Sequence, residues 1–281
     1  MSMIYVIFAA KNRIIMRKTT SLLITATFAL AGCTGMSTPA QLTFDSLSVE
    51  KRVALTADTN SPAYEMKLNV KYVKEGSDEM RKSVNDAITA KIFNLHNVDI
   101  KMAVDSFVNE NSHTYINDML PLYEEDKRDI DKMPIYQHEA IINTRTEDGK
   151  EGIVTYYINM YNFTGGAHGL EQLLTLNFDK TTGKTITLDD VMVTGYQMRL
   201  NELLQKALLE KADCKDINEL HDKGYLFSME MYPSSNFVLG KDGVTFIYNP
   251  YEIAPYALGR IELTLSYSTL EPIMKKNKEK E

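Results

Sequence analysis

A tight turn between two long segments constrains the fold of this chain more than any other feature. Residues 135–146 and 152–163 read as long strands, and the turn Glu147-Asp148-Gly149-Lys150 separates them. Asp-Gly is a dipeptide that β-hairpin turns favour, because it tolerates the positive φ that such turns require. The two segments therefore predict an antiparallel hairpin, and with it a sheet whose neighbouring strands run in opposite directions.

The rest of the chain combines further strands with a few amphipathic helices. A strand or a strand pair is predicted at residues 42–57 and again at 63–73, and single strands at 173–179, 244–248 and 260–267. Helices are predicted from Ser77, a suitable N-cap before Asp78 and Glu79, and over residues 99–120 and 196–211. Because the helices are inserted between groups of strands and do not alternate with them, the pattern predicts an α+β fold. We expect antiparallel sheets packed with amphipathic helices in two coupled lobes.

The amino-terminal segment has the features of an export signal. Arg17-Lys18 precedes the apolar residues 22–29, and Leu30-Ala31-Gly32-Cys33 follows. A basic start, a short apolar stretch and small residues before a cleavage point are typical of a signal peptide. Leu-Ala-Gly-Cys resembles the bacterial lipobox, in which the cysteine is acylated; the alternative is a chance cysteine after an ordinary signal. We expect residues 1–32 to be a signal peptide, with 1–15 as an upstream false start.

This expectation divides the chain into a lipid-anchored tether and a folded body. Residues 33–41 form the tether, which begins at the lipidated Cys33 and anchors the protein to a membrane of the bacterial cell envelope, facing the periplasm or the surface. A first domain is expected at 42–180, a second at 181–270 and a charged tail at 271–281. Once Cys33 is acylated, Cys214 has no intramolecular partner, so the fold depends on its core and not on disulfides.

The charge balance of the chain favours cationic partners. The sequence has 31 Lys and Arg against 38 Asp and Glu residues, and the expected signal peptide holds four of the basic residues and no acid. Its removal leaves 27 basic and 38 acidic residues, a formal net charge of −11. An anionic surface argues against nucleic acid and anionic lipid headgroups as ligands and steers cationic proteins toward it; the modest alternative is solubility alone.

The segment 249–259, Asn-Pro-Tyr-Glu-Ile-Ala-Pro-Tyr-Ala-Leu-Gly, is the first candidate binding site. Its two prolines exclude a regular helix or a central strand, so it predicts a rigid loop. Pro250, Tyr251, Glu252, Pro255 and Tyr256 are its candidate binding residues, because exposed tyrosines offer a large contact area at low entropic cost. The structural alternative is a strand connection with Glu252 bonded to the backbone and tyrosines in the core. We expect one of the two tyrosines to be a core residue.

A second candidate is the glycine-rich segment 162–169, Asn-Phe-Thr-Gly-Gly-Ala-His-Gly. Its glycines permit positive φ and close backbone approach, so His168 is expected to be exposed. Gly165, Gly166 and His168 are its candidate binding residues. The alternative is a tight strand connection in which His168 bonds to a neighbouring backbone group, and for catalysis we favour that alternative, because no acid lies nearby in sequence to orient the imidazole.

The remaining polar residues give no sign of a metal or cofactor site. No two of the five histidines have the i, i+4 spacing of helical metal ligands, and Cys214 is alone. Nucleophile-elbow, phosphate-loop and dinucleotide-binding motifs are all missing from the sequence. Asp189-Asp190 precedes a predicted helix, where such pairs are more often capping and turn residues than catalytic carboxylates.

Three stretches of the sequence resemble motifs of the RsiV/PdaC-like family. They are residues 164–169, residues 250–257 and the turn that runs from Phe178-Asp179 to Leu188-Asp189-Asp190. The likeness covers roughly residues 45–268 and implies an α+β fold, with a PdaC-like amino-terminal domain at 42–180 and an RsiV-like carboxy-terminal domain at 181–270. For some members the family implies direct binding of lysozyme as a signal. This chain departs from the family in two respects. A lipobox stands where the anti-sigma members have a sigma-binding segment and a membrane helix, and the Thr-Phe-Asp-Asp and His-x-x-x-His motifs of the deacetylase members do not occur.

These observations support one leading hypothesis and two alternatives. The leading hypothesis is a lipid-anchored, non-enzymatic envelope protein that recognises a lysozyme-like muramidase or peptidoglycan, without cofactor or metal. The first alternative is a hydrolase or deacetylase-like enzyme of cell-wall glycan or peptide, in which folding brings His168 next to an acid such as Glu252. The second is a structural or assembly lipoprotein with no small ligand.

Overall fold

The computed structural model describes residues 42–276, so the expected signal peptide, Cys33, the tether and the last five residues lie outside the described part. Over this range the fold is α+β, with two open sheets and the two lobes that the sequence predicts. Among the described residues, we find no helix with the length and apolar character needed to span a bilayer.

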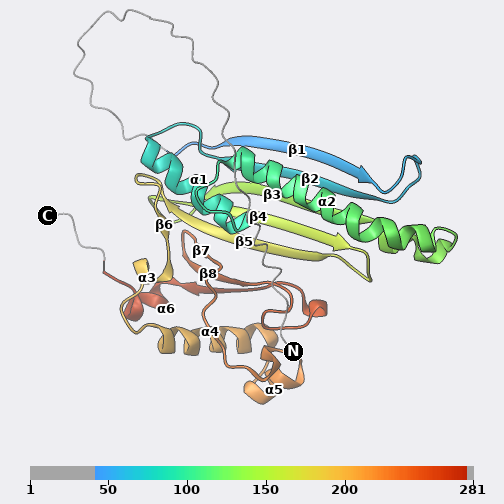
Figure 1. Ribbon diagram of the computed structural model, residues 1–281. Helices are drawn as coiled ribbons and strands as arrows, with labels where there is room; N and C mark the ends of the chain where they lie inside the picture. Colours follow the sequence, from blue (N-terminus) through green and yellow to red (C-terminus); the bar gives the residue numbers. More distant parts are fainter. Residues whose placement is uncertain (1–41, 277–281) are drawn as a thin grey trace, which may run out of the picture. The chain divides into compact units, whose positions relative to one another are not determined.

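The larger lobe is built on a six-stranded sheet with the strand order β1-β2-β3-β4-β5-β6 (Figure 1). The strands are β1 (Asp45–Ala54), β2 (Ala63–Tyr72), β3 (His138–Asp148), β4 (Ile153–Thr164), β5 (Leu170–Asp179) and β6 (Thr185–Ile186). All neighbouring pairs are antiparallel except β2 and β3. The exception follows from the connection between them, because its two helices return the chain to the end of the sheet where β2 begins.

Two helices cover one face of this sheet (Figure 1). Helix α1 (Asp78–Phe93) starts at the predicted N-cap Ser77, whose side chain accepts a hydrogen bond from Met80 N, and α2 (Ile100–Asp126) starts at the N-cap Asp99. Alternate residues of the strands face the helices and form a core with the helices' apolar stripes. This core includes Met66, Val70, Val84, Ile88, Val104, Ile142, Tyr156, Ile158 and Phe178.

The smaller lobe is a three-stranded antiparallel sheet with its own core. Its strands are β7 (Phe237–Leu239), β8 (Gly243–Tyr248) and β9 (Ile261–Ser266). Its helices are α3 (Leu188–Val191), α4 (Gln197–Ala212), α5 (Ile217–Asp222) and α6 (Tyr267–Leu270). The apolar side of α4, with Leu200, Leu204 and Leu208 fully buried, packs on this sheet.

Buried polar side chains join the two lobes at the face of β5 that the helices leave open. The Thr175 hydroxyl donates to Asn236 Oδ1 and Phe237 O, both at 2.9 Å. The Asn177 amide donates to Phe237 O at 2.8 Å and its oxygen accepts from Leu239 N at 3.1 Å. Because every partner in this network is buried and paired, separating the lobes would expose or orphan several polar groups.

Some boundaries differ from the sequence-based expectations. The predicted strand at 135–146 begins at His138, because Pro134 lies in a 3₁₀-helix, η1 (Ile130–Tyr136), that precedes it. The short strands β6 and β7 and helix α5 were not expected. The expected tail from residue 271 starts later, since η4 (Glu271–Ile273) buries Ile273 and Met274 forms a bridge with Met192.

Candidate functional site

The structure brings the two candidate loops together. Residues 164–169 connect β4 with β5 in the larger lobe, and 249–259 connect β8 with β9 in the smaller one. The imidazole of His168 stacks on the ring of Tyr256, with centroids 3.7 Å apart and planes inclined by 15°. The Tyr251 ring lies 5.9 Å from that of Tyr256 at 31°. We call His168, Tyr251 and Tyr256 the aromatic cluster.

Glycines shape the loop that carries His168. Gly165 has φ +73°, and a Cβ there would lie 2.0 Å from the carbonyl oxygen of Ile135, so only glycine fits. A Cβ at Gly169 would lie 2.3 Å from the ring of Tyr161, which packs against the loop. Nothing lies within 4 Å of a Cβ placed at Gly166. His168 itself is exposed, and its Nδ1 lies 3.1 Å from Gly169 O, as the strand-connection interpretation expected.

Asn249 fixes residues 249–259, which we call the Pro-Tyr loop, to the larger lobe. It is 2% exposed, and its side-chain oxygen accepts from Leu173 N at 2.7 Å while its amide donates to Leu173 O at 3.2 Å. Glu252 closes the same turn, because its carboxylate accepts from Asn249 N at 2.9 Å. The backbone N–H of Tyr251 donates to Ala254 O at 2.9 Å. The Asn249 side chain thus attaches the loop to β5, and the bonds of Glu252 and Tyr251 fix the conformation within the loop.

The two tyrosines of the loop differ from the expectation that one would be core. Tyr251 is 42% exposed and Tyr256 is half-buried, whereas the residues between them that reach the core are Ile253 and Ala254. Tyr251 also has φ +72°, a left-handed conformation that costs a bulky residue about 1–3 kcal/mol. A strained, exposed tyrosine is more consistent with a binding role than with packing.

A third segment, absent from the sequence-based prediction, borders the Pro-Tyr loop that carries Tyr251 and Tyr256. Leu226 N donates to Ile253 O at 2.6 Å, which places the segment after α5 beside the Pro-Tyr loop. Leu226 and Phe227 both have positive φ, at +62° and +46°. Leu226 is buried but Phe227 is 47% exposed, and Met229 is exposed beyond it. The sequence gives little sign that this segment is exposed. The apolar residues after Gly224 follow no periodic pattern, so nothing distinguishes exposed from buried ones.

The arrangement gives no support to a catalytic pairing of His168 and Glu252. The Glu252 carboxylate is occupied by Asn249, and the described hydrogen bonds include none between it and the imidazole. Residues 42–276 contain no group of three or more His, Cys, Asp or Glu side chains arranged to hold a metal ion. The aromatic cluster offers stacking surface and one imidazole, which suits recognition.

Asp190 and Asp189 have separate roles. Asp190 accepts from Thr187 N at 2.7 Å and from the Thr187 hydroxyl at 2.6 Å in a capping box, which confirms the predicted capping role. These hydrogen bonds lower the pKa of the Asp190 carboxyl below its ordinary value. Asp189 instead lines a cavity between the lobes, near Tyr196.

Comparison with solved structures places the chain in a family. A crystal structure of a DUF3298 family member from Bacteroides fragilis is 30% identical in sequence, with a TM-score of 0.75, and the alignment covers 84% of this chain and 94% of that one. This chain belongs to the DUF3298 family. A second DUF3298 structure, from Pseudomonas aeruginosa PAO1, has 18% identity, a TM-score of 0.59 and coverage of 85% and 97%, and shows the shared fold.

The two lobes of this DUF3298 protein also match family descriptions in sequence. Residues 189–268 match the family described as "Protein of unknown function (DUF3298)", and residues 57–171 match the one described as "Deacetylase PdaC". The peptidoglycan-N-acetylmuramic acid deacetylase PdaC of Bacillus subtilis is 23% identical over 160 residues, 54% of this chain. The match covers 33% of that enzyme's length, so the chain spans about a third of this relative.

Proposed function

We propose that this protein is a non-catalytic component of the bacterial cell envelope that binds a lysozyme-like muramidase through its aromatic cluster. The observation that carries the proposal is the stacking of His168 on Tyr256. Two loops about 90 residues apart in sequence, one from each lobe, form one partly exposed surface there. Interface hot spots are typically such clusters of aromatic side chains on a rigid support.

Family and charge support the envelope setting and the type of partner. The PdaC relative is named for an activity on peptidoglycan, and the segment 1–33 has the sequence pattern of a lipoprotein signal. The whole chain has a formal net charge of −7, and −11 remains without residues 1–32. A negative protein attracts cationic wall hydrolases over a range of about 10 Å at 0.1 M salt.

The conformation of the Pro-Tyr loop supports a protein partner. Asn249 and Glu252 hold the loop before any partner arrives, so little conformational entropy is lost on binding. The strain at Tyr251 has no role in the packing of the core, since the side chain is exposed. Peptidoglycan is the second candidate partner, favoured by the name of the PdaC relative and by the stacking surface that tyrosine and histidine rings provide.

Direct binding tests the proposal and separates the two partners. We expect immobilised protein to bind purified lysozyme in biolayer interferometry, and Tyr256→Ala to weaken the affinity at least tenfold, the effect of about 1.4 kcal/mol. Tyr72→Ala is the matched control. Tyr72 is at the far end of β2 from the aromatic cluster. Tyr64 of the same strand is in register with His138 and Thr164, where the loop that carries His168 begins. Tyr72 follows Tyr64 by eight residues, so it is about 27 Å from that end of the sheet at 3.4 Å per residue.

Sedimentation with purified peptidoglycan forms the second arm. Binding to peptidoglycan alone, weakened by Tyr256→Ala, would identify the glycan polymer as the ligand in place of the muramidase. Binding to neither partner, or equal loss in the Tyr256 and Tyr72 variants, would refute the proposal.

A further inference from the structure

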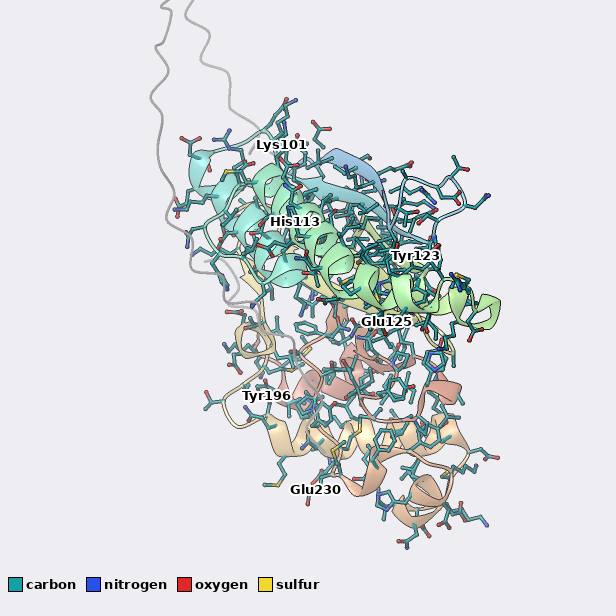
Figure 2. The ribbon with its side chains drawn as sticks, turned by 45° about the vertical axis from the view of Figure 1, so that its right-hand side comes forward. Lys101, His113, Tyr123, Glu125, Tyr196 and Glu230 are labelled. Atoms are coloured by element: carbon teal, nitrogen blue, oxygen red, sulfur yellow. The ribbon has the colours of Figure 1, made fainter. Side chains whose placement is uncertain are left out.

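A cavity of about 360 Å³ lies where the two lobes meet, separate from the aromatic cluster. Lys91 of α1 and the β5 residues Thr175 and Asn177 contribute from the larger lobe, whereas Tyr196 and Phe237 contribute from the smaller one. Figure 2 shows Tyr196 at the start of α4, below the larger sheet. Cavities of 300–1,000 Å³ between two lobes are common sites for small ligands.

The edge of β5 reaches this cavity with one residue unpaired. The backbone groups of Leu173 point away from β4, and asparagine side chains bind them. The N–H donates to Asn249 Oδ1, and the C=O accepts from the side-chain amides of Asn236 and Asn249. At Asn177 the neighbouring strand β6 takes over, with Ile186 as its partner. Thr175 lies between them and points the same way, because backbone groups alternate with a period of two along a strand.

No partner for these outward backbone groups of Thr175 occurs in the described part of the chain. One free donor and one free acceptor at a strand edge are what an extended peptide pairs with when it adds to a sheet. Since asparagine side chains cap the edge at Leu173, the available stretch accommodates only a very short segment of peptide.

Lys91 supplies an unpaired positive charge in the same cavity. It is half-buried in the last turn of α1, and residues 42–276 give its ammonium group no hydrogen bond or ion pair. Burial lowers the pKa of Lys91 below its ordinary value, and the charge of Glu252 opposes this only in part. Glu252 does not line the cavity, and its carboxylate is held by Asn249. Asp189, the acid that does line the cavity, is exposed.

The remaining wall suits small apolar side chains. Phe237, Ile186 and Pro233 provide apolar surface, and Tyr196 is nearly buried beside Asp189. Burial, followed by the charge of the nearby Asp189 carboxylate and a hydrogen bond to it, raises the pKa of the Tyr196 phenol, so this group stays protonated. The cavity thus combines a cation, a strand edge and an apolar wall.

We propose that this cavity binds the carboxyl-terminal end of a short peptide. The terminal carboxylate pairs with Lys91, the last peptide unit pairs with the backbone of Thr175, and the side chain of the terminal residue lies against Phe237 and Ile186. A carboxylate gives the half-desolvated ammonium the counter-ion that the chain itself does not provide. The site is independent of the aromatic cluster, so the two proposals succeed or fail separately.

Dipeptide titrations followed by ¹H–¹⁵N NMR test this inference on the full chain. L-alanyl-L-alanine represents protein carboxyl termini, and D-alanyl-D-alanine represents peptides containing D-residues. We expect at least one of these dipeptides to cause saturable shifts in the amide signals of Thr175 and its neighbours. The corresponding dipeptide amides, L-alanyl-L-alanine amide and D-alanyl-D-alanine amide, lack the carboxylate. We expect each amide to bind at least tenfold more weakly than its parent dipeptide. Whichever stereoisomer binds more tightly identifies the source.

Lys91→Gln should weaken binding of the active dipeptide at least tenfold. Lys82→Gln, which removes an exposed lysine of the same helix, should leave it unchanged, as should Tyr256→Ala. Absence of saturable shifts with both dipeptides, equal binding of the corresponding amide, or equal affinity of the Lys91 and Lys82 variants would overturn the proposal. If Lys91→Gln fails to fold, the comparison of carboxylate with amide on the unaltered chain decides the question.

Discussion

Asn249 is the residue on which the position of the Pro-Tyr loop most depends, and its replacement gives a quantitative prediction. In Asn249→Ala, Leu173 N loses its acceptor at 2.7 Å and has no other partner in the described chain. Leu173 O keeps the amide of Asn236 as a donor at 2.6 Å. One orphaned buried N–H costs about 1–3 kcal/mol, and the lost side-chain volume raises the total to about 2–4 kcal/mol.

Thermal and urea unfolding measure this cost. At roughly 2–4 °C per kcal/mol for a domain of this size, a loss of about 3 kcal/mol lowers Tm by roughly 6–12 °C. Asn249→Asp is the informative second variant. It retains an acceptor for Leu173 N but places a carboxylate oxygen against Leu173 O and Glu252.

The introduced carboxyl group should have a raised pKa in the folded state, because burial and the neighbouring oxygens disfavour its charged form. The stability deficit of Asn249→Asp should therefore shrink as pH falls and this carboxylate takes up a proton. A change of less than 0.5 kcal/mol in Asn249→Ala, on the scale expected of ordinary surface substitutions, would refute the proposed anchoring. So would a deficit in Asn249→Asp that does not depend on pH.

Three further predictions concern backbone conformation and burial. Gly165→Ala should lower the free energy of unfolding in urea by about 3 kcal/mol or more, because the new Cβ would overlap Ile135 O and the residue has a positive φ. Gly166→Ala, the control, should change it by less than about 0.5 kcal/mol, because a Cβ there meets nothing within 4 Å. Tyr251→Gly should raise stability by about 1 kcal/mol through relief of strain while weakening lysozyme binding; a loss of stability would contradict a strained tyrosine. Burial lowers the pKa of His138 in the folded state. The free energy of unfolding should therefore fall as pH drops below about 6.5, by at most about 1.4 kcal/mol per pH unit. Urea titrations at pH 7, 6 and 5 should show this fall in the unaltered chain and its loss in His138→Gln.

The parts of the fold that the sequence predicted are those with strong local signals. The hairpin between β3 and β4 was predicted from Asp148-Gly149, and the start of α1 from Ser77. The turn itself lies further along than predicted, because Asp148 still pairs with Val154 and the positive φ is at Gly152 and not at Gly149. The loop character of 249–259 followed from its prolines. In each case a few adjacent residues determine the backbone conformation, so no knowledge of distant contacts is needed.

The parts that could not be predicted depend on contacts between distant residues. Strands β6 and β7 are two and three residues long, too short for a period of two to be recognised. Leu226 and Phe227 take positive φ where the segment docks on Ile253, a residue distant in sequence. The stacking of His168 on Tyr256 requires the two lobes to be in register, which no local pattern specifies.

Hydrogen–deuterium exchange of the protein with and without lysozyme tests the binding surface most directly. Because the aromatic cluster spans two loops, we expect lysozyme to slow exchange in residues 164–169 and 249–259 together, and to leave α1 and the edge strand β1 unchanged. Protection of α1 or β1 with no change in either loop would contradict the assignment of the aromatic cluster as the binding surface.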